Sequence, residues 1–272
     1  MPPLQHPSSD YIAGRFLPIP GVSIASRDPS NPSRIIWSGS PNLAHVDQAV
    51  AAARGTLPAW AAASLDDRVA LLKRWAEITT RRAGDIASLI TDEMGKTLSE
   101  SLAEAKLLAD KVAITLDKIS LGRVSDYDAP LTATRKGVCR FKPHGVMAVI
   151  GPFNFPAHLP NGHFVPALLL GNTIVLKPSE KTPGVGQLLA ELMHEIGVPP
   201  GVFNVIQGGG DIAAKLVDHD IDGILFTGSW PVGRKILEAN LDHPGRMIAL
   251  EMGGNNPAVV MNDAYLKQAV IE

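Results

Sequence analysis

Residues 145–180 read GVMAVIGPFNFPAHLPNGHFVPALLLGNTIVLKPSE, and the fold follows from this stretch. Two short apolar runs, 146–150 and 173–176, are separated by residues that open with Pro and Asn and continue in a helical pattern. This pattern predicts a strand, a crossover helix and a second strand. Because the runs are apolar on both faces, we expect the strands to lie in a buried parallel sheet. Ligands of such sheets bind beyond the carboxyl ends of the strands.

The same alternation continues along the chain. It predicts an α/β fold, a doubly wound and mainly parallel sheet with right-handed crossovers. The expected helices are 157–170, 184–196, 212–217 and 232–239, and the further expected strands are 202–206, 223–226, 247–250 and 258–261.

The N-terminal part lacks this alternation. Residues 1–40 are rich in Pro, Ser, Gly and Asn, and we interpret them as an extended arm with β-type pieces at 11–16 and 34–37. From residue 42 onward, apolar residues recur at helical spacing, which predicts a helical layer. The last of its helices is expected to run to residue 119. The residues expected to cap these helices are Asn42, Ser64, Asp85 and Thr97.

A β-hairpin is expected at 123–143, where β-branched and basic residues alternate. Such a strand with a polar face can serve as a sheet edge for a partner. The chain is thus interpreted as an arm and helical layer over 1–122, this hairpin, and an α/β domain over 144–272.

Composition excludes several classes of protein. Charged residues make up 19% of the chain and the formal net charge is -2, which gives no support for nucleic acid as a partner. The single cysteine, Cys139, excludes an internal disulfide and fits a reducing compartment. No signal peptide or membrane-length apolar run is visible, so we expect a cytoplasmic protein without a membrane partner. No histidine spacing resembles a metal site, and His158 and His163 are assigned a structural role by default.

Two strand ends carry groups that suit a nucleotide. In FTGSWPVG, residues 226–233, Gly228 frees the turn, Ser229 offers a hydroxyl and the following helix presents its amide groups to a phosphate. A plain strand-to-helix turn is an equal alternative, because the middle glycine of the usual fingerprint is missing. Lys177 and Glu180 could bind ribose hydroxyls, and the carboxylate would favour NAD. The alternative for this pair is a solvated loop.

Two further residues could carry chemistry. Glu251 follows the strand 247–250 and could act as a general base, the alternative being an exposed acid in a turn. Asn154 lies between aromatic residues and prolines that would hold its amide rigid, as an oxyanion hole requires. The alternative for Asn154 is a cap of the next helix.

Together these segments resemble the NAD(P)-dependent aldehyde dehydrogenase superfamily, in which GPFNFP, GNTIVLKPSE, PPGVFNVIQG, FTGS and LEMGGNNP occur in this order. The resemblance covers nearly the whole chain and implies an NAD-binding domain at 144–272. It also implies an oligomerisation hairpin, and hence a homo-oligomer when complete. It further implies that Asn154 is the oxyanion-hole donor and Glu251 the general base. The cofactor-binding residues that it implies are Ile150, Pro152, Phe153, Lys177, Ser179, Glu180, Gly208, Phe226, Gly228, Ser229, Gly233 and Gly253.

Within the superfamily, PAHLPNGHFVPALLLGN and LEMGGNNP are most similar to the succinylglutamate semialdehyde dehydrogenase subgroup, which serves arginine catabolism. This similarity implies a small-molecule aldehyde as substrate and NAD-dependent oxidation of that aldehyde to a carboxylic acid. Leu159, Gly162 and His163 would line the substrate entrance, where the small Gly162 leaves room for a bulky, anionic molecule.

The chain also departs from this family. The family's cysteine nucleophile comes after the EMGG segment, and Cys139 lies before the first expected sheet strand, so we expect Cys139 to be a structural residue or a bystander. We therefore expect a chain truncated before the nucleophile and inactive alone. A non-catalytic NAD-binding or subunit-interaction module is the alternative, and a reductase of acyl phosphates would need the same cysteine. Trp230 stands where the family has small residues and could crowd or cover the pyrophosphate.

Overall fold

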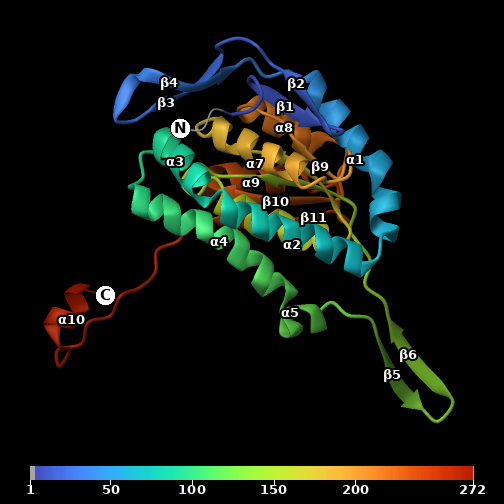
Figure 1. Ribbon diagram of the computed structural model, residues 1–272. Helices are drawn as coiled ribbons and strands as arrows, with labels where there is room; N and C mark the ends of the chain where they lie inside the picture. Colours follow the sequence, from blue (N-terminus) through green and yellow to red (C-terminus); the bar gives the residue numbers. More distant parts are fainter. Residues whose placement is uncertain (1–3, 272) are drawn as a thin grey trace.

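A computed structural model describes residues 4–271 and is built around one seven-stranded sheet (Figure 1). The strand order is β11-β10-β7-β8-β9-β1-β2, in which the first five strands run parallel and β1 and β2 are antiparallel additions at one edge. This confirms the expected α/β fold with a mainly parallel sheet. The strands are β1 Ser9–Ile12, β2 Arg15–Pro18, β7 Val146–Ile150, β8 Thr173–Lys177, β9 Phe203–Val205, β10 Gly223–Gly228 and β11 Met247–Met252.

The strand order reverses beside β7. From β7 the chain moves outward to β8 and β9, then returns to place β10 on the other side of β7 and β11 beyond it. The register pairs Met147 with Gly223 and Ile150 with Phe226. A reversal of this kind opens a crevice at the carboxyl ends of the two central strands, because their connections leave in opposite directions.

Helices cover both faces of the sheet. Alternate residues of β7 point to opposite faces, so Met147 and Val149 join one hydrophobic core and Ala148 joins the other. The first core lies under α6 and α7, and the second lies under α1, α8 and α9. These helices are α1 Ala44–Ala62, α6 His158–Leu169, α7 Pro183–Glu195, α8 Gly210–Asp218 and α9 Trp230–Ala239.

The helical layer predicted from residue 42 onward is divided between the two faces of the sheet: α1 covers one face, and the other three helices pack on the outside of α6 and α7. These three helices are α2 Leu65–Arg81, α3 Ala83–Met94 and α4 Leu98–Leu116. Trp75 of α2 is fully buried, and its indole Nε1 donates to Asn161 Oδ1 of α6 at 2.7 Å. Asn161 in turn donates to the Leu108 carbonyl of α4 at 3.2 Å, so one buried amide joins three helices.

Two of the predicted caps are confirmed. The Ser64 side chain accepts from the backbone N–H of Asp67, and Thr97 forms a reciprocal capping box with Glu100. Asn42 lies before the N-cap position, although its side chain accepts from Ala44 N at 3.0 Å. The Asp85 cap is wrong.

The region around Asp85 differs because α2 and α3 are nearly continuous. Arg82 closes α2 and opens α3, so Asp85 falls in the first turn of α3 and pairs with Arg82. The fourth helix is also shorter than expected. It ends at Leu116, because Asp117 leaves the helical conformation and caps the short α5, Lys118–Gly122.

The N-terminal segment is part of the sheet rather than a free arm. The expected β-piece 11–16 is wrong as a single strand, because Ala13 and Gly14 have positive φ and form the turn between β1 and β2. All four residues of β1 are buried, and Tyr11 pairs with Val205 of β9. A separate hairpin, β3 Ile24–Asp28 and β4 Asn31–Gly39, contains the other expected piece.

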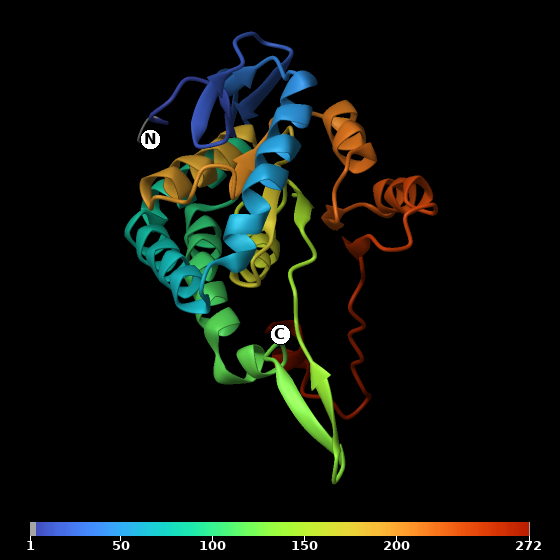
Figure 2. The ribbon, with the colours of Figure 1, turned by 90° about the vertical axis from the view of Figure 1, so that its right-hand side faces the viewer.

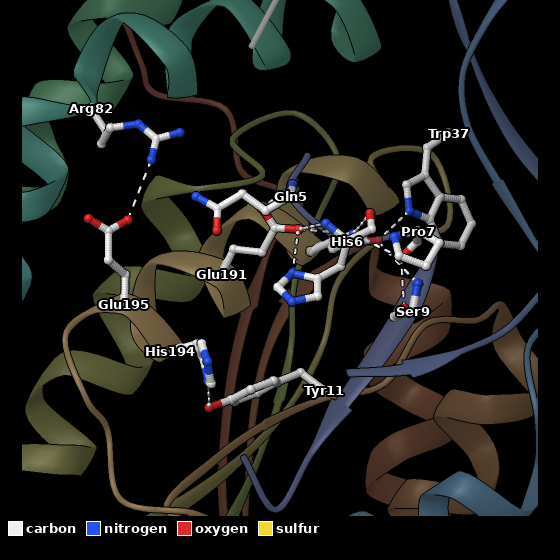
Figure 3. A network of polar contacts seen from close by, with 11 residues as sticks. Gln5, His6, Pro7, Ser9, Tyr11, Trp37, Arg82, Glu191, His194 and Glu195 are labelled. Atoms are coloured by element: carbon white, nitrogen blue, oxygen red, sulfur yellow. Dashed lines mark hydrogen bonds and ion pairs between the residues drawn. The ribbon is translucent and has the colours of Figure 1, made fainter. Parts of the chain in front are cut away.

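Figure 3 shows how this segment is fixed to α7. The Glu191 carboxylate accepts from the backbone N–H groups of Gln5 and His6, at 3.0 and 3.1 Å. The Gln187 amide oxygen accepts from Ser9 N at 3.2 Å and from Trp37 Nε1 at 2.8 Å. We call this set of contacts, made by Gln187 and Glu191, the anchor network.

Two parts extend from the body of the molecule (Figures 1 and 2). The predicted hairpin is confirmed as β5 Tyr127–Thr132 and β6 Arg135–Cys139. The C-terminal segment leaves the sheet after β11 and ends in α10, Leu266–Ile271. The expected strand 258–261 is wrong, because its apolar residues are exposed and have no neighbouring strand to pair with; Val259 is 79% exposed. No helix within residues 4–271 is long and apolar enough to cross a membrane.

Candidate functional site

A cavity of about 930 Å³ lies at the carboxyl ends of β7, β8 and β10, where the strand order reverses. The structure therefore brings together strand ends that are far apart in the sequence. Twelve of the predicted catalytic and cofactor residues line this cavity: Ile150, Pro152, Phe153, Asn154, Lys177, Ser179, Glu180, Phe226, Gly228, Ser229, Glu251 and Gly253.

The two other predicted residues, Gly208 and Gly233, lie behind the cavity wall. A Cβ on Gly208 would stand 2.2 Å from the side chain of Ile212, and the backbone φ is +152°. A Cβ on Gly233 would stand 2.4 Å from the sulfur of Met252. A side chain at either position would clash with a neighbour, so both positions favour glycine.

Lys177 is held rigidly at the end of β8. The side chain is buried, and its Nζ donates to the carbonyls of Pro178 at 2.6 Å and Gly208 at 2.8 Å. The Glu180 carboxylate is 3.8 Å away. Burial lowers the pKa of Lys177 to about 8, while Glu180 opposes the shift. The alternative of a solvated loop is therefore wrong for Lys177, although Glu180 itself is exposed.

The N-terminus of α9 faces the same cavity. Ser229 is the N-cap residue, and its carbonyl accepts from Val232 N and Gly233 N at 3.2 and 3.0 Å. Its hydroxyl makes no capping hydrogen bond. Trp230 is 58% exposed and lies outside the cavity wall, so it does not fill the space in front of the helix.

Asn154 does not cap the following helix. Its Oδ1 accepts only from the adjacent Phe155 N, at 3.1 Å. The first N–H groups of α6, on Ala157 and His158, donate instead to the Glu104 carboxylate at 3.0 and 3.1 Å. The Nδ2 group of Asn154 has no protein partner in the described part of the chain, and because the residue is exposed, this group is open to solvent or to a ligand.

Glu251 lies on β11, in register with Thr227 of β10, and not in a turn. Its carboxylate has no hydrogen bond or ion pair within residues 4–271. Its negative charge acts on His163, whose ring Nε2 lies 3.0 Å from Thr227 Oγ1. Burial lowers the pKa of His163, and Glu251 opposes this effect. The site thus holds a carboxylate from β11 and an imidazole from α6 that lies against the end of β10.

Two residues of the cavity wall, His158 and Lys111, have features that the sequence did not predict. The Nδ1 atom of His158 is buried and has no hydrogen-bond partner in residues 4–271. Lys111 of α4 reaches the wall from the helical layer, for which the sequence predicted no site. The missing signal is tertiary, because it is the packing of α4 on α6 that brings Lys111 to the cavity. The described residues contain no group of three or more His, Cys, Asp or Glu side chains that could hold a metal ion.

Comparisons with known proteins agree with this geometry. Residues 20–272 match the model of the aldehyde dehydrogenase family. The N-succinylglutamate 5-semialdehyde dehydrogenase of Ectopseudomonas mendocina is 44% identical over 265 residues, which are 97% of this chain and 54% of that protein. The chain thus spans about half the length of this relative.

Solved structures show the same likeness. An NADP-dependent enzyme of E. coli has a TM-score of 0.91 at 31% identity, over 99% of this chain and 57% of that one. An NAD-dependent aldehyde dehydrogenase of Sinorhizobium meliloti has a TM-score of 0.90 at 30% identity, over 98% of this chain and 54% of that one.

Proposed function

The chain belongs to the aldehyde dehydrogenase family, and on this premise we propose that it forms the NAD-binding part of an enzyme that oxidises an aldehyde to a carboxylic acid. The proposed substrate is succinylglutamate semialdehyde, the aldehyde in the name of the relative that is 44% identical. The observation that supports the proposal most strongly is the convergence of unpartnered polar groups on the cavity beside β7 and β10.

The wall suits NAD at two points. The Ser229 hydroxyl and the N-terminus of α9 suit a pyrophosphate, because amide groups and the helix dipole favour negative charge there. Lys177 and Glu180 suit a ribose, with the ammonium as donor and the carboxylate as acceptor. The exposed Glu180 carboxylate disfavours a 2'-phosphate, so we propose NAD rather than NADP.

When bound, the nicotinamide supplies the acceptor for the hydride that leaves the aldehyde carbon. The chain's own residues then have two roles. The free Nδ2 of Asn154 donates to the aldehyde oxygen as negative charge develops on it. Glu251 accepts a proton from the water that releases the acid product.

The family's nucleophile is a cysteine, and no residue of the cavity wall is one. Cys139 is the only cysteine among the 272 residues and lies at the end of β6 in the projecting hairpin. The proposed reaction therefore requires a thiolate in addition to the groups that these residues provide.

We also propose that the hairpin contacts a second subunit in a homo-oligomer. Tyr127, Leu131 and Val138 are 59%, 67% and 54% exposed there, which is more apolar surface than a free hairpin needs. A non-catalytic NAD-binding or subunit-interaction module remains the second candidate, and the exposed hairpin together with the position of Cys139 favours it.

Calorimetric titration of the 272-residue chain with NAD and NADP tests the cofactor proposal. We expect NAD to bind, and the double variant Lys177→Met, Glu180→Ala to lose this binding. The matched control Lys73→Ala, Glu77→Ala changes an exposed pair on α2 and should bind as the wild type does. A folded wild type that binds neither dinucleotide, or a double variant that binds NAD normally, would overturn the assignment.

A further inference from the structure

The substrate end of the cavity is formed where α4 packs on α6. His158, Gly162 and His163 of α6 line this cavity together with Lys111 of α4. The sequence predicted a substrate entrance on α6 alone. The structure adds a cationic side chain from a second helix.

Lys111 differs from the two other lysines of the cavity wall, Lys177 and Lys181, and from the nearby Lys96, which does not line the cavity. Lys177 is bound to two backbone carbonyls. Lys181 lies over the ring of Phe153, with its Nζ 4.3 Å from the ring centroid. Lys96 is paired with the buried Glu104 carboxylate at 2.7 Å. Lys111 alone among these has no hydrogen-bond, ion-pair or ring partner in the part of the chain that the structure describes.

The positive charge of Lys111 acts on the two histidines of the cavity wall. Burial lowers the pKa of both His158 and His163, and the positive charge of Lys111 lowers both further. Lys111, His158 and His163 all line the same cavity. Burial disfavours the charged form of both rings, although Glu104 opposes this effect on His158 and Glu251 opposes it on His163. Lys111 is the lysine of the cavity wall whose ammonium group has no protein partner in residues 4–271.

Gly162 supplies the space beside this cation. A Cβ added at Gly162 would meet no atom within 4 Å. The glycine is therefore not required by helix packing, in contrast to Gly208 and Gly233. The open volume belongs to the cavity and can be occupied by a ligand chain between the lysine and the strand ends.

From this arrangement we infer that Lys111 is the specificity-determining residue of the substrate end: its ammonium group binds a carboxylate of an anionic aldehyde, and Gly162 leaves room for the chain that joins this carboxylate to the aldehyde. The inference rests on the proposed function, since it assigns a role within the same cavity. Lys111 favours carboxylate-bearing aldehydes over neutral ones, because an ammonium group without a protein partner gains most from a charged ligand.

The test uses the stable product N-succinylglutamate as the probe and NAD-saturated protein in calorimetry. Lys111→Gln is expected to weaken binding of the probe about tenfold or more, while Lys111→Arg retains most of it. Lys106→Gln is the matched control, because Lys106 is an exposed residue of the same helix outside the cavity wall and should have no effect. Binding of the probe to Lys111→Gln as tightly as to the wild type would overturn the inference.

A second variant tests the space rather than the charge. Gly162→Leu extends a side chain into the cavity and should abolish binding of N-succinylglutamate. We expect no loss of thermal stability, because a Cβ at this position meets no atom within 4 Å and the residue lines the cavity. Unchanged binding by this variant would contradict the subsite.

A spectroscopic readout separates a direct contact from a distant effect. In the wild type, the bound carboxylate should raise the NMR-detected pKa of His158 and His163, because it offsets the charge of Lys111. In Lys111→Gln both values should start higher and should not respond to the probe.

NAD binding is measured on every sample. Intact NAD binding without any binding of the probe would refute the subsite and leave the proposed cofactor role standing. Probe binding that depends on Lys111, without NAD binding, would support the subsite and refute the proposed function.

Discussion

The anchor network on α7 and the cavity beside β7 and β10 both place polar side chains against the same sheet, but they treat them differently. In the anchor network, Gln187 and Glu191 accept four N–H groups from the N-terminal segment and Trp37. In the cavity, the Asn154 amide, the Ser229 hydroxyl and the Lys111 ammonium have no protein partner in residues 4–271. Buried polar groups are costly unless they are hydrogen-bonded. Gln187 and Glu191 are buried and are satisfied within the protein, whereas Asn154 and Ser229 are exposed and Lys111 is half-buried, so their polar groups can be solvated until a ligand replaces the water.

The largest effect is expected where the network is fully satisfied. Gln187→Leu keeps the side-chain volume but leaves Ser9 N and Trp37 Nε1 buried without an acceptor. We expect the free energy of unfolding to fall by about 4 kcal/mol, because each orphaned donor costs its desolvation. Urea denaturation measures this change. A loss below about 1 kcal/mol would contradict the structural role of the anchor network.

The other end of α7 offers a test by pH. The Glu93 carboxylate is fully buried and accepts from Ser26 Oγ, Gly184 N and Val185 N, at 2.5, 2.9 and 2.8 Å. Burial raises the pKa of Glu93 from 4.5 to about 7. Between these two pH values the folded chain retains a proton that the unfolded chain has lost. Stability should therefore decrease as the pH rises through this window and level off above it.

The size of this effect is about 3 kcal/mol, from the difference between the two pKa values of Glu93. Denaturation curves at a series of pH values measure it. In Glu93→Gln the pH dependence of stability over this window should be lost. An unchanged slope in this variant would assign the dependence to other groups.

In the cavity, we expect a substitution to change stability little and to weaken NAD binding instead. Ser229→Ala removes a hydroxyl that makes no capping hydrogen bond, so the free energy of unfolding should change by less than about 0.5 kcal/mol. NAD binding should weaken about fivefold, which corresponds to one hydrogen bond. A serine with a structural role would show the reverse: the Ala variant would lose stability and keep its NAD affinity.

The smallest effect is expected for Asn154→Ala. The side chain bonds only to the adjacent Phe155 N and does not cap α6, so both stability and NAD affinity should remain near their wild-type values. Differential scanning calorimetry and NAD titration check this. A marked loss of stability would show that Asn154 has a structural role and that its amide is not free for a ligand.

The order of elements could be predicted from the sequence, because the strands 146–150 and 173–176 are apolar throughout and their ends carry Asn154 and Lys177. The contact of β1 with β9 could not be predicted, because it is antiparallel and joins residues from opposite ends of the chain. The apolar run at 258–261 was misleading for a related reason. Its composition suits a strand, but a strand requires a neighbour, and β11 is the sheet edge.

The candidate site shows the same division. Residues that follow directly from strand ends, such as Ser229 and Glu251, could be placed from the sequence. Gly233, which the resemblance assigns to the cofactor, is not among the residues that line the cavity, and a Cβ there would clash with Met252. Lys111 was missed, because a lysine in an amphipathic helix carries no sign of which tertiary contact it faces. Sequence motifs locate strand-end chemistry, whereas side chains that arrive from another layer need the fold.

Hydrogen exchange of the 272-residue chain with and without NAD, followed by mass spectrometry, tests whether the cavity beside β7 and β10 binds NAD. We expect NAD to protect backbone amides in the loops that follow β7, β8 and β10, and to leave exchange in the anchor network unchanged. Protection confined to residues 5–9 and α7, or no protection in any loop of the cavity at saturating NAD, would contradict this expectation.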